Sequence, residues 1–158
     1  MTPSHPENFF QFEKLLVAIA SAGVDFAVVG GVAVSLNGFV RSTDDVDILV
    51  NEEKTNIEKL LECLSHWGEG WARELKAEEF IAQEGSIRIM EEFDLYIFTR
   101  MLGHSLNEFR PRLRTLAIED FTIPYLSPED LILLKASSWR EKDQIDVAAL
   151  RKIIAAKR

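Results

Sequence analysis

The chain has 158 residues, of which 47% are hydrophobic and 28% charged, and its 26 acidic and 18 basic side chains give a net charge of -8. A chain of this length buries a core of useful size, so we expect one domain over residues 1–158, with a helical C-terminal part from about residue 127 packed on it. The acidic balance excludes a broadly basic, nonspecific DNA-binding protein, because affinity for phosphate depends on clustered Lys and Arg.

Cysteine and histidine usage narrows the class of protein further. The single cysteine, Cys63, excludes an internal disulfide, and His5, His66 and His104 have no metal-ligand spacing. The apolar segment at residues 15–20 is short and follows acidic residues, unlike a secretory signal, and no other run is long enough to span a bilayer. We therefore expect a cytoplasmic protein that makes no membrane contact.

The charge is unevenly distributed along the chain. Residues 1–99 carry 7 basic and 18 acidic side chains, whereas residues 100–158 carry 11 basic and 8 acidic ones. A polyanion would therefore dock on the C-terminal third. The densest basic run, Arg110, Arg112 and Arg114, is equally consistent with one solvated face of a strand.

The N-terminal half alternates helical and strand patterns. Residues 8–22 repeat apolar side chains at helical spacing and stop at Gly23. Residues 25–29 and 45–50 are almost continuously apolar, which is typical of central strands, and a short helix is expected over residues 32–37. Thr55 and Glu58 have the spacing of a capping box that opens a helix through Leu64.

The C-terminal half predicts more strands and then two helices. Residues 67–83 are compatible with a loop, a short helix or an irregular edge. Residues 86–90 and 93–98 predict a hairpin, and residues 113–118 and 121–125 predict strands that close a sheet edge. Ser127 is the expected N-cap of a helix over residues 128–138, before a last helix over residues 143–156. These patterns predict an α/β (α+β) fold, a mixed β-sheet with helices packed on it.

Two acidic residues interrupt the predicted strand at residues 45–50. Alternate side chains of a strand share a face, so Asp45 and Asp47 project together, roughly 7 Å apart at the backbone. Each carboxylate raises the pKa of the other unless a cation lies between them, so the pair indicates a divalent metal site. Such a pair alone is common on protein surfaces, and its weight comes from the residues around it.

A glycine pair precedes these acids. Gly30 and Gly31 follow a buried strand and open a short helix, where backbone N–H groups are accessible to a phosphate. Alone, the pair would be an ordinary tight turn. Together with Asp45 and Asp47, it predicts a phosphate site next to a metal site.

These residues resemble the nucleotidyltransferase superfamily typified by DNA polymerase beta, and within it the small prokaryotic minimal and AbiEii-type enzymes. In that family a hydrophobic strand leads to Gly-Gly or Gly-Ser, a short helix follows, and a strand then carries Asp-x-Asp. A third acid on a neighbouring strand is matched by Asp94. The resemblance also includes residues 41–43, residues 127–132, Lys135 and residues 140–146, with Asp143 as the acidic member of a C-terminal signature, so it touches most of the chain.

The resemblance implies a Mg²⁺-dependent enzyme, with Mn²⁺ as the other candidate metal, that moves a nucleoside monophosphate from an NTP to a hydroxyl of a protein, a tRNA or a small molecule. It implies that Asp45, Asp47 and Asp94 hold the metal. It further implies that Gly30 and Gly31 hold phosphates, and it makes Arg41 and Lys135 candidate phosphate contacts.

Several alternatives remain open at this stage. The same fold is compatible with a catalytically silent binding partner, for example in a toxin–antitoxin pair. Glu91 or Glu92 could replace Asp94 as the third acid, since the strand register is undetermined. Lys135 could pair with an acid of the last helix in a junction spanning residues 140–146. Packing is the preferred interpretation of the three tryptophans, Trp67, Trp71 and Trp139.

Overall fold

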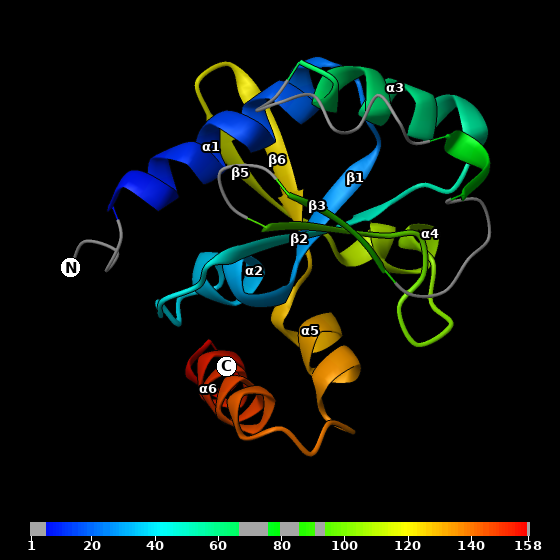
Figure 1. Ribbon diagram of the computed structural model, residues 1–158. Helices are drawn as coiled ribbons and strands as arrows, with labels where there is room; N and C mark the ends of the chain where they lie inside the picture. Colours follow the sequence, from blue (N-terminus) through cyan, green and yellow to red (C-terminus); the bar gives the residue numbers. More distant parts are fainter. Residues whose placement is uncertain (1–5, 67–75, 80–85, 91–93, 158) are drawn as a thin grey trace.

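The computed structural model describes residues 6–66, 76–79, 86–90 and 94–157 (Figure 1). The predicted mixed α/β architecture is confirmed: a six-stranded sheet with the order β3-β4-β2-β1-β6-β5 runs through the described part of the chain. Its strands are β1 (Phe26–Val29), β2 (Asp45–Val50), β3 (Ser86–Met90), β4 (Asp94–Phe98), β5 (Arg114–Ile118) and β6 (Phe121–Tyr125).

The strand directions place the site residues near the middle of the sheet. β2 pairs antiparallel with β1 and parallel with β4, and β1 pairs parallel with β6. The two hairpins, β3–β4 and β5–β6, extend the sheet on either side. Because β1, β2 and β4 lie side by side, the residues at the start of β2 and β4 adjoin the segment that follows β1.

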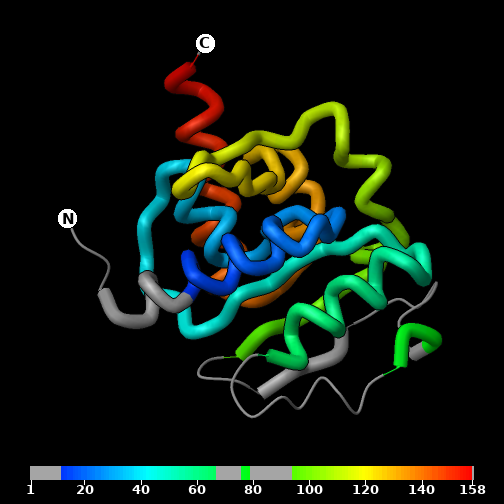
Figure 2. Tube along the Cα trace, turned by 90° about the horizontal axis from the view of Figure 1, so that it is seen from above, coloured from blue at the N-terminus to red at the C-terminus, as the bar shows by residue number. Residues whose placement is uncertain are grey.

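Helices cover both faces of the sheet. Figures 1 and 2 show α1 (Pro6–Ser21) and α3 (Lys54–Leu64) over one face, and α2 (Gly30–Leu36), α5 (Pro128–Lys135) and α6 (Glu141–Ala156) on the other. The short helix α4 (Leu106–Phe109) and the 3-10 turns η2 (Ala77–Glu79) and η3 (Arg110–Arg112) complete the described elements. The layers follow from apolar helix faces that are buried, as in α3, whose buried apolar residues are Ile57, Leu60, Leu61 and Leu64.

The hydrophobic core lies mainly between the sheet and the α1–α3 layer. Val46 and Ile48 of β2 and Leu95 and Ile97 of β4 are fully buried. They alternate with the acidic positions of the same strands, so β2 and β4 present apolar side chains to the core and polar ones to the opposite face. This alternation leaves the α2–α5–α6 face available for chemistry.

The sequence predicts side-chain caps at the N-termini of α5 and α3, and the structure confirms only the cap of α5. Ser127 caps α5 as predicted, with its hydroxyl accepting from the Asp130 backbone N–H at 3.2 Å. The capping box predicted at Thr55 and Glu58 is wrong, because α3 begins at Lys54 after Glu53, which makes no side-chain cap. Asn56 instead ties the first turn to its surroundings, donating to the backbone oxygens of Asp25 and Asn51.

The basic run at residues 110–114 is not one face of a strand. Arg110 and Arg112 lie in η3, and each pairs with an acid elsewhere in the fold: Arg110 with Asp25 at 2.7 Å and Arg112 with Asp130 at 2.9 Å. Pro111 sits within this 3-10 turn, a position that suits its fixed φ angle. Arg110 and Arg112 therefore join η3 to the residue before β1 and to α5, whereas Arg114 begins β5 and donates to Asn37 Oδ1 at 3.3 Å.

Candidate active site

Strand register places the three acids predicted from the sequence on two neighbouring strands. Asp45 lies opposite Asp94 in the parallel β2–β4 pair, and Asp47 lies opposite Tyr96. Paired residues of neighbouring strands share a face, so the three carboxylates start from the same face of adjoining strands. Glu91 and Glu92, the alternative third acids, lie outside the described residues.

A cavity of about 350 Å³ opens on this face. Its sheet wall carries Asp45, Asp47, Tyr96 and Phe98, and its helix wall carries Lys135, Arg140, Lys142 and Asp143. Gly30, Gly31, Arg41 and Thr43 complete the lining between the two walls. The volume lies in the range of small-molecule sites, and the lining is largely polar and charged. Asp94 is not among the lining residues.

The glycine pair allows the chain to pass close to the acids. Gly30 has φ +65, a conformation that L side chains rarely adopt, and a Cβ placed there would collide with the Asp47 carboxylate, 2.8 Å from its Cγ. A Cβ on Gly31 would meet Arg41 Nη2 at 3.0 Å and Thr43 Oγ1 at 3.1 Å. Gly30 is therefore required by space and by conformation, independently of any phosphate, whereas a Cβ at Gly31 would require only the Arg41 and Thr43 side chains to shift.

The sheet wall is electrostatically unfavourable as it stands. Burial, and then the charge of Asp45, raises the pKa of Asp47 from 3.8 to about 6, against the weaker opposing influence of Lys135, Lys142 and Arg41. Two carboxylates close together and partly removed from water resist joint ionisation. The predicted repulsion by Asp45 thus acts on Asp47, where burial is the larger cause of the raised pKa.

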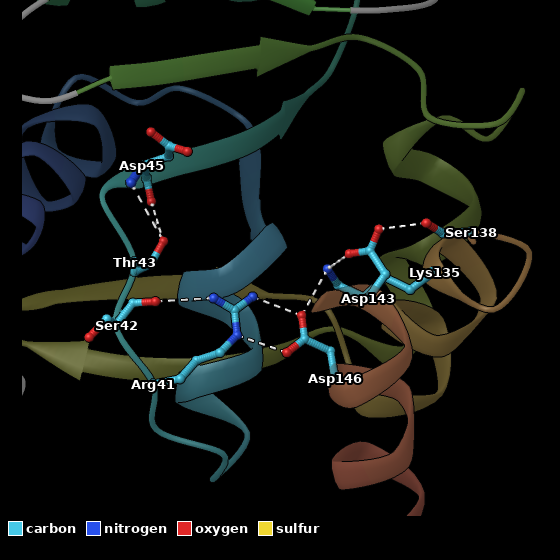
Figure 3. Close-up of polar contacts among 8 residues, drawn as sticks. All are labelled: Arg41, Ser42, Thr43, Asp45, Lys135, Ser138, Asp143 and Asp146. Atoms are coloured by element: carbon cyan, nitrogen blue, oxygen red, sulfur yellow. Dashed lines mark hydrogen bonds and ion pairs between the residues drawn. The ribbon is translucent and has the colours of Figure 1, made fainter. Parts of the chain in front are cut away.

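The helix wall, in contrast, is built from ion pairs (Figure 3). Asp146 on α6 accepts from Arg41 Nε at 2.8 Å and from Arg41 Nη2 at 2.7 Å, and its side chain is 0% exposed. Lys135 Nζ, at the end of α5, contacts Asp143 at 3.0 Å and Asp146 at 3.1 Å. Ser138 donates to Asp143 at 2.8 Å, so Asp143 on this wall and Asp146 behind it both have defined partners.

These pairs determine the protonation of the helix wall. Burial alone would raise the pKa of Asp146, but the hydrogen bond from Arg41 and the charge of Lys135 lower it below its ordinary value. The same opposition between burial and hydrogen bonds from Lys135 and Ser138 lowers the pKa of Asp143. Both carboxylates are therefore ionised and matched at neutral pH.

The structure extends the set of candidate site residues. Arg41 and Lys135 line the cavity, and both pair with acids of α6, as one alternative anticipated for Lys135. Arg140 and Lys142 also line the cavity, although sequence reasoning gave neither a site role. Among the described residues, neither of these two side chains forms a hydrogen bond or an ion pair. The sequence signal that could have identified them is their position in the C-terminal signature at residues 140–146.

Asp146 and Trp139 were also misjudged. The sequence interpretation included Asp146 only as the last residue of the C-terminal signature. In the structure it contacts Arg41 and Lys135, two cations that line the cavity. Trp139 was interpreted as packing, and this is wrong: its side chain is 87% exposed in the turn between α5 and α6. Trp67 and Trp71 lie outside the described residues.

The arrangement supplies oxygen ligands on one wall and positive charge on the other. In the described part of the chain, no three His, Cys, Asp or Glu side chains gather closely enough to form a ready metal cage. A polyanion accompanied by a divalent cation is the ligand that would complement both walls at once. No helix in the described ranges combines the length and the apolar character needed to cross a bilayer.

Comparison with solved structures identifies the fold. The chain is 16% identical to a candidate nucleotidyltransferase of Thermotoga maritima, over 100% of this chain and 97% of that one, with a TM-score of 0.58. It is 15% identical to the lincomycin-bound lincosamide antibiotic adenylyltransferase LnuA, over 97% and 99%, with a TM-score of 0.59. A nucleotidyltransferase-like antigenic protein of Paracoccidioides brasiliensis is 18% identical over 99% and 79%, also with a TM-score of 0.59.

Sequence comparison reaches the same family. No curated protein matches the chain significantly. A family model described as a nucleotidyltransferase of unknown function, DUF6036, matches residues 8–155 and so includes every site residue discussed above. The nucleotidyltransferase resemblance of the sequence is thereby confirmed, and the chain belongs to the DUF6036 family of nucleotidyltransferases.

Proposed function

We propose that this protein transfers a nucleoside monophosphate from an NTP to a hydroxyl of an acceptor molecule, in a Mg²⁺-dependent reaction within the cavity between the sheet wall and the helix wall. The observation that carries the proposal is the placement of Asp45 and Asp47 in one cavity with four cationic side chains. The acids of the sheet wall would be neutralised by the metal ion of a metal–triphosphate complex. The cations of the helix wall would be neutralised by its phosphates.

The acids of the sheet wall suit magnesium by their chemistry. Mg²⁺ prefers oxygen ligands, and it is usually held by one or two carboxylates together with substrate phosphates and water. Asp45 and Asp47 would hold it, with Asp94 as a further candidate from the adjoining strand. The raised pKa of Asp47 fits this assignment, because a cation between the two carboxylates relieves the repulsion that Asp45 exerts. When bound, the metal neutralises charge on the phosphates and on the attacking oxygen.

The cations of the cavity would bind and orient the triphosphate. Lys142 carries a charge that already acts on Asp47, so it lies within reach of any phosphate held there. Arg41 lies against Gly31, which places a guanidinium beside the glycine pair. Phosphoryl-transfer chemistry needs mainly positioning and charge stabilisation, which these groups provide without a covalent intermediate.

The acceptor is a hydroxyl of a tRNA, a partner protein or a small molecule. The lincosamide antibiotic adenylyltransferase LnuA shares this fold, which supports a small molecule as one class of acceptor. The decisive experiment incubates the protein with each α-labelled NTP, Mg²⁺ and total cell extract. We expect one class of macromolecule or small molecule to become labelled with one preferred NTP. Absence of label from all four NTPs contradicts the proposal.

A second candidate function is that of a catalytically silent partner in a toxin–antitoxin pair. The exposed Trp139 favours it, together with the half-exposed Leu133 and Ile145 of the same helical hairpin, because large exposed apolar side chains often mark interaction surfaces. Under this hypothesis, the protein would co-purify with a partner at fixed stoichiometry but would label no acceptor in the experiment above.

A further inference from the structure

The cations Arg41 and Lys135 are held from behind by one buried carboxylate. Asp146 does not line the cavity, yet both of its oxygens are engaged: Oδ1 accepts from Arg41 Nε, and Oδ2 accepts from Arg41 Nη2 and Lys135 Nζ. The exposed fractions of the Arg41 and Lys135 side chains are 16% and 13%. Asp146 thus joins two residues that are far apart in the sequence at one edge of the cavity.

Arg41 and Lys135 each use some of their N–H donors in these contacts, and each keeps at least one other N–H donor. With the described residues, Arg41 donates from Nε, from Nη2 and, to the Ser42 carbonyl, from Nη1. A guanidinium has five N–H donors and an ammonium has three, so neither cation has exhausted its set. The terminal nitrogens of Arg41 lie 3.0 and 3.1 Å from the position that a Cβ would take at Gly31, and both residues line the cavity.

We propose that Asp146 is a positioning residue of the nucleotide site: it fixes Arg41 and Lys135 so that their remaining N–H donors face the phosphates. This inference rests on the proposed function for the identity of the ligand. Arg and Lys side chains have many rotamers, and a ligand gains affinity when these are ordered before it binds. Asp146 supplies that order from a location that the ligand never touches.

The opposite role makes the opposite prediction. If Asp146 merely competed with phosphate for the two cations, removing its charge would strengthen phosphate binding, because the cavity would become more positive. If Asp146 positions the cations, removing the charge weakens binding, since long side chains without a buried partner turn toward solvent. The sign of the change therefore separates the two roles.

The fold supplies a matched control in Asp130. This residue is also buried, and its carboxylate accepts from Arg112 Nε at 2.9 and 3.1 Å. Neither Asp130 nor Arg112 lines the cavity. Asp130→Asn and Asp146→Asn thus remove the same kind of buried Asp–Arg pair, one away from the site and one behind it.

The experiment measures the dissociation constants of inorganic tripolyphosphate and of the preferred NTP by calorimetry, each with Mg²⁺. We expect Asp146→Asn to weaken both by about tenfold or more, the size of a lost charge-assisted hydrogen bond, and Asp130→Asn to change them less than about twofold. In the transfer assay, Asp146→Asn should raise KM for the NTP with little change in kcat. In an Arg41→Ala background, Asp146→Asn should have a much smaller effect, which shows that it acts through Arg41.

Each outcome decides one of the two proposals. Unchanged or tighter tripolyphosphate binding by Asp146→Asn overturns the positioning role. If Asp146→Asn does not fold, Asp146→Glu keeps the charge but moves the carboxylate by one methylene. It should weaken binding in the same direction, and wild-type affinity in that variant overturns the role. Wild-type protein that binds tripolyphosphate but transfers no nucleotide leaves the positioning role standing and rejects the proposed function; binding of neither ligand rejects both.

Discussion

The two walls of the cavity differ in how their charges are matched. On the helix wall, Asp143 and the underlying Asp146 are paired with Lys135 and Arg41, and their pKa values lie below the ordinary value. On the sheet wall, Asp47 faces Asp45, and its pKa lies well above the ordinary value. The same residue type is thus stabilised as an anion on one side of the cavity and destabilised on the other.

We infer from this difference that the fold fixes the charges of the helix wall, whereas a ligand would resolve those of the sheet wall. Matched buried ion pairs define a geometry, whereas unmatched like charges persist in a fold when a ligand resolves them. The helix wall can therefore be regarded as a rigid frame that carries cations. Under the proposed function, a metal ion would complete the sheet wall.

The largest effect is expected from removing the sheet-wall charges. Asp45→Asn and Asp47→Asn should each lower nucleotidyl transfer by about a thousandfold, or about 4 kcal/mol, because metal binding supplies several kcal/mol of transition-state stabilisation. The exposed neighbour Asp44 provides the control, and Asp44→Asn should retain activity within a few-fold. Single-turnover labelling with the preferred NTP measures both. Full transfer by Asp47→Asn contradicts a role for the sheet wall in catalysis.

A smaller effect is expected where the backbone approaches Asp47. Gly30→Ala adds a Cβ that collides with the Asp47 carboxylate, whereas Gly103→Ala, at φ +79, meets nothing within 4 Å. Both substitutions place Ala in a conformation that costs about 1 kcal/mol, and the collision adds further strain, so Gly30→Ala should lower the free energy of unfolding by about 3 kcal/mol. Urea unfolding compares them. Equal losses for the two variants show that Gly30 is needed for its φ angle alone.

The pH dependence of stability tests the charge repulsion directly. In the folded metal-free protein Asp47 has a pKa of about 6 against the ordinary 3.8, so the folded state binds the proton more tightly, and stability falls as the pH rises through that interval. Asp47→Asn should therefore match wild type near pH 4 and exceed it by about 2 kcal/mol at pH 7.5, after allowance for partial exposure.

Urea unfolding in EDTA at the two pH values provides this measurement. Addition of Mg²⁺ at pH 7.5 should then stabilise wild type and not Asp47→Asn. A stability difference between the two proteins that is the same at both pH values would mean that Asp47 is not strained by its surroundings.

The smallest effect is expected at Trp139. Its side chain is 87% exposed, so Trp139→Ala should change the free energy of unfolding by less than about 0.5 kcal/mol. A loss above about 2 kcal/mol would restore the packing role that the structure argues against. If binding to an acceptor or partner protein weakens at the same time as stability is unchanged, Trp139 belongs to an interaction surface.

Local sequence patterns were sufficient for the sheet wall. Asp45 and Asp47 share a face because a strand repeats every second residue, and Gly30 was selected because a glycine turn that opens a helix exposes N–H groups to a phosphate. The Ser127 cap also follows from neighbours in the chain. The family resemblance also gave Asp94, which lies opposite Asp45 in the structure, as an acid on a neighbouring strand.

Contacts between distant segments were not predictable in the same way. Arg41 and Asp146 are separated by 105 residues, and no local pattern specifies that they meet. The arginines at 110, 112 and 114 alternate as on one face of a strand, but only Arg114 lies in β5. Arg110 and Arg112 lie in a 3-10 turn and pair with Asp25 and Asp130. The Thr55 capping box failed for a related reason, since Asn56 bonds to the segment before β1 and to Asn51, and the helix starts earlier.

The most direct test of the central claim measures NTP binding with and without a divalent metal. The dissociation constants of ATP, CTP, GTP and UTP are determined by calorimetry for the wild-type protein, first with Mg²⁺ and then with EDTA. We expect at least one NTP to bind with Mg²⁺ and EDTA to weaken its binding about tenfold or more, because the sheet-wall acids then repel the phosphates. Binding of no NTP, or equal binding in both conditions, contradicts the account.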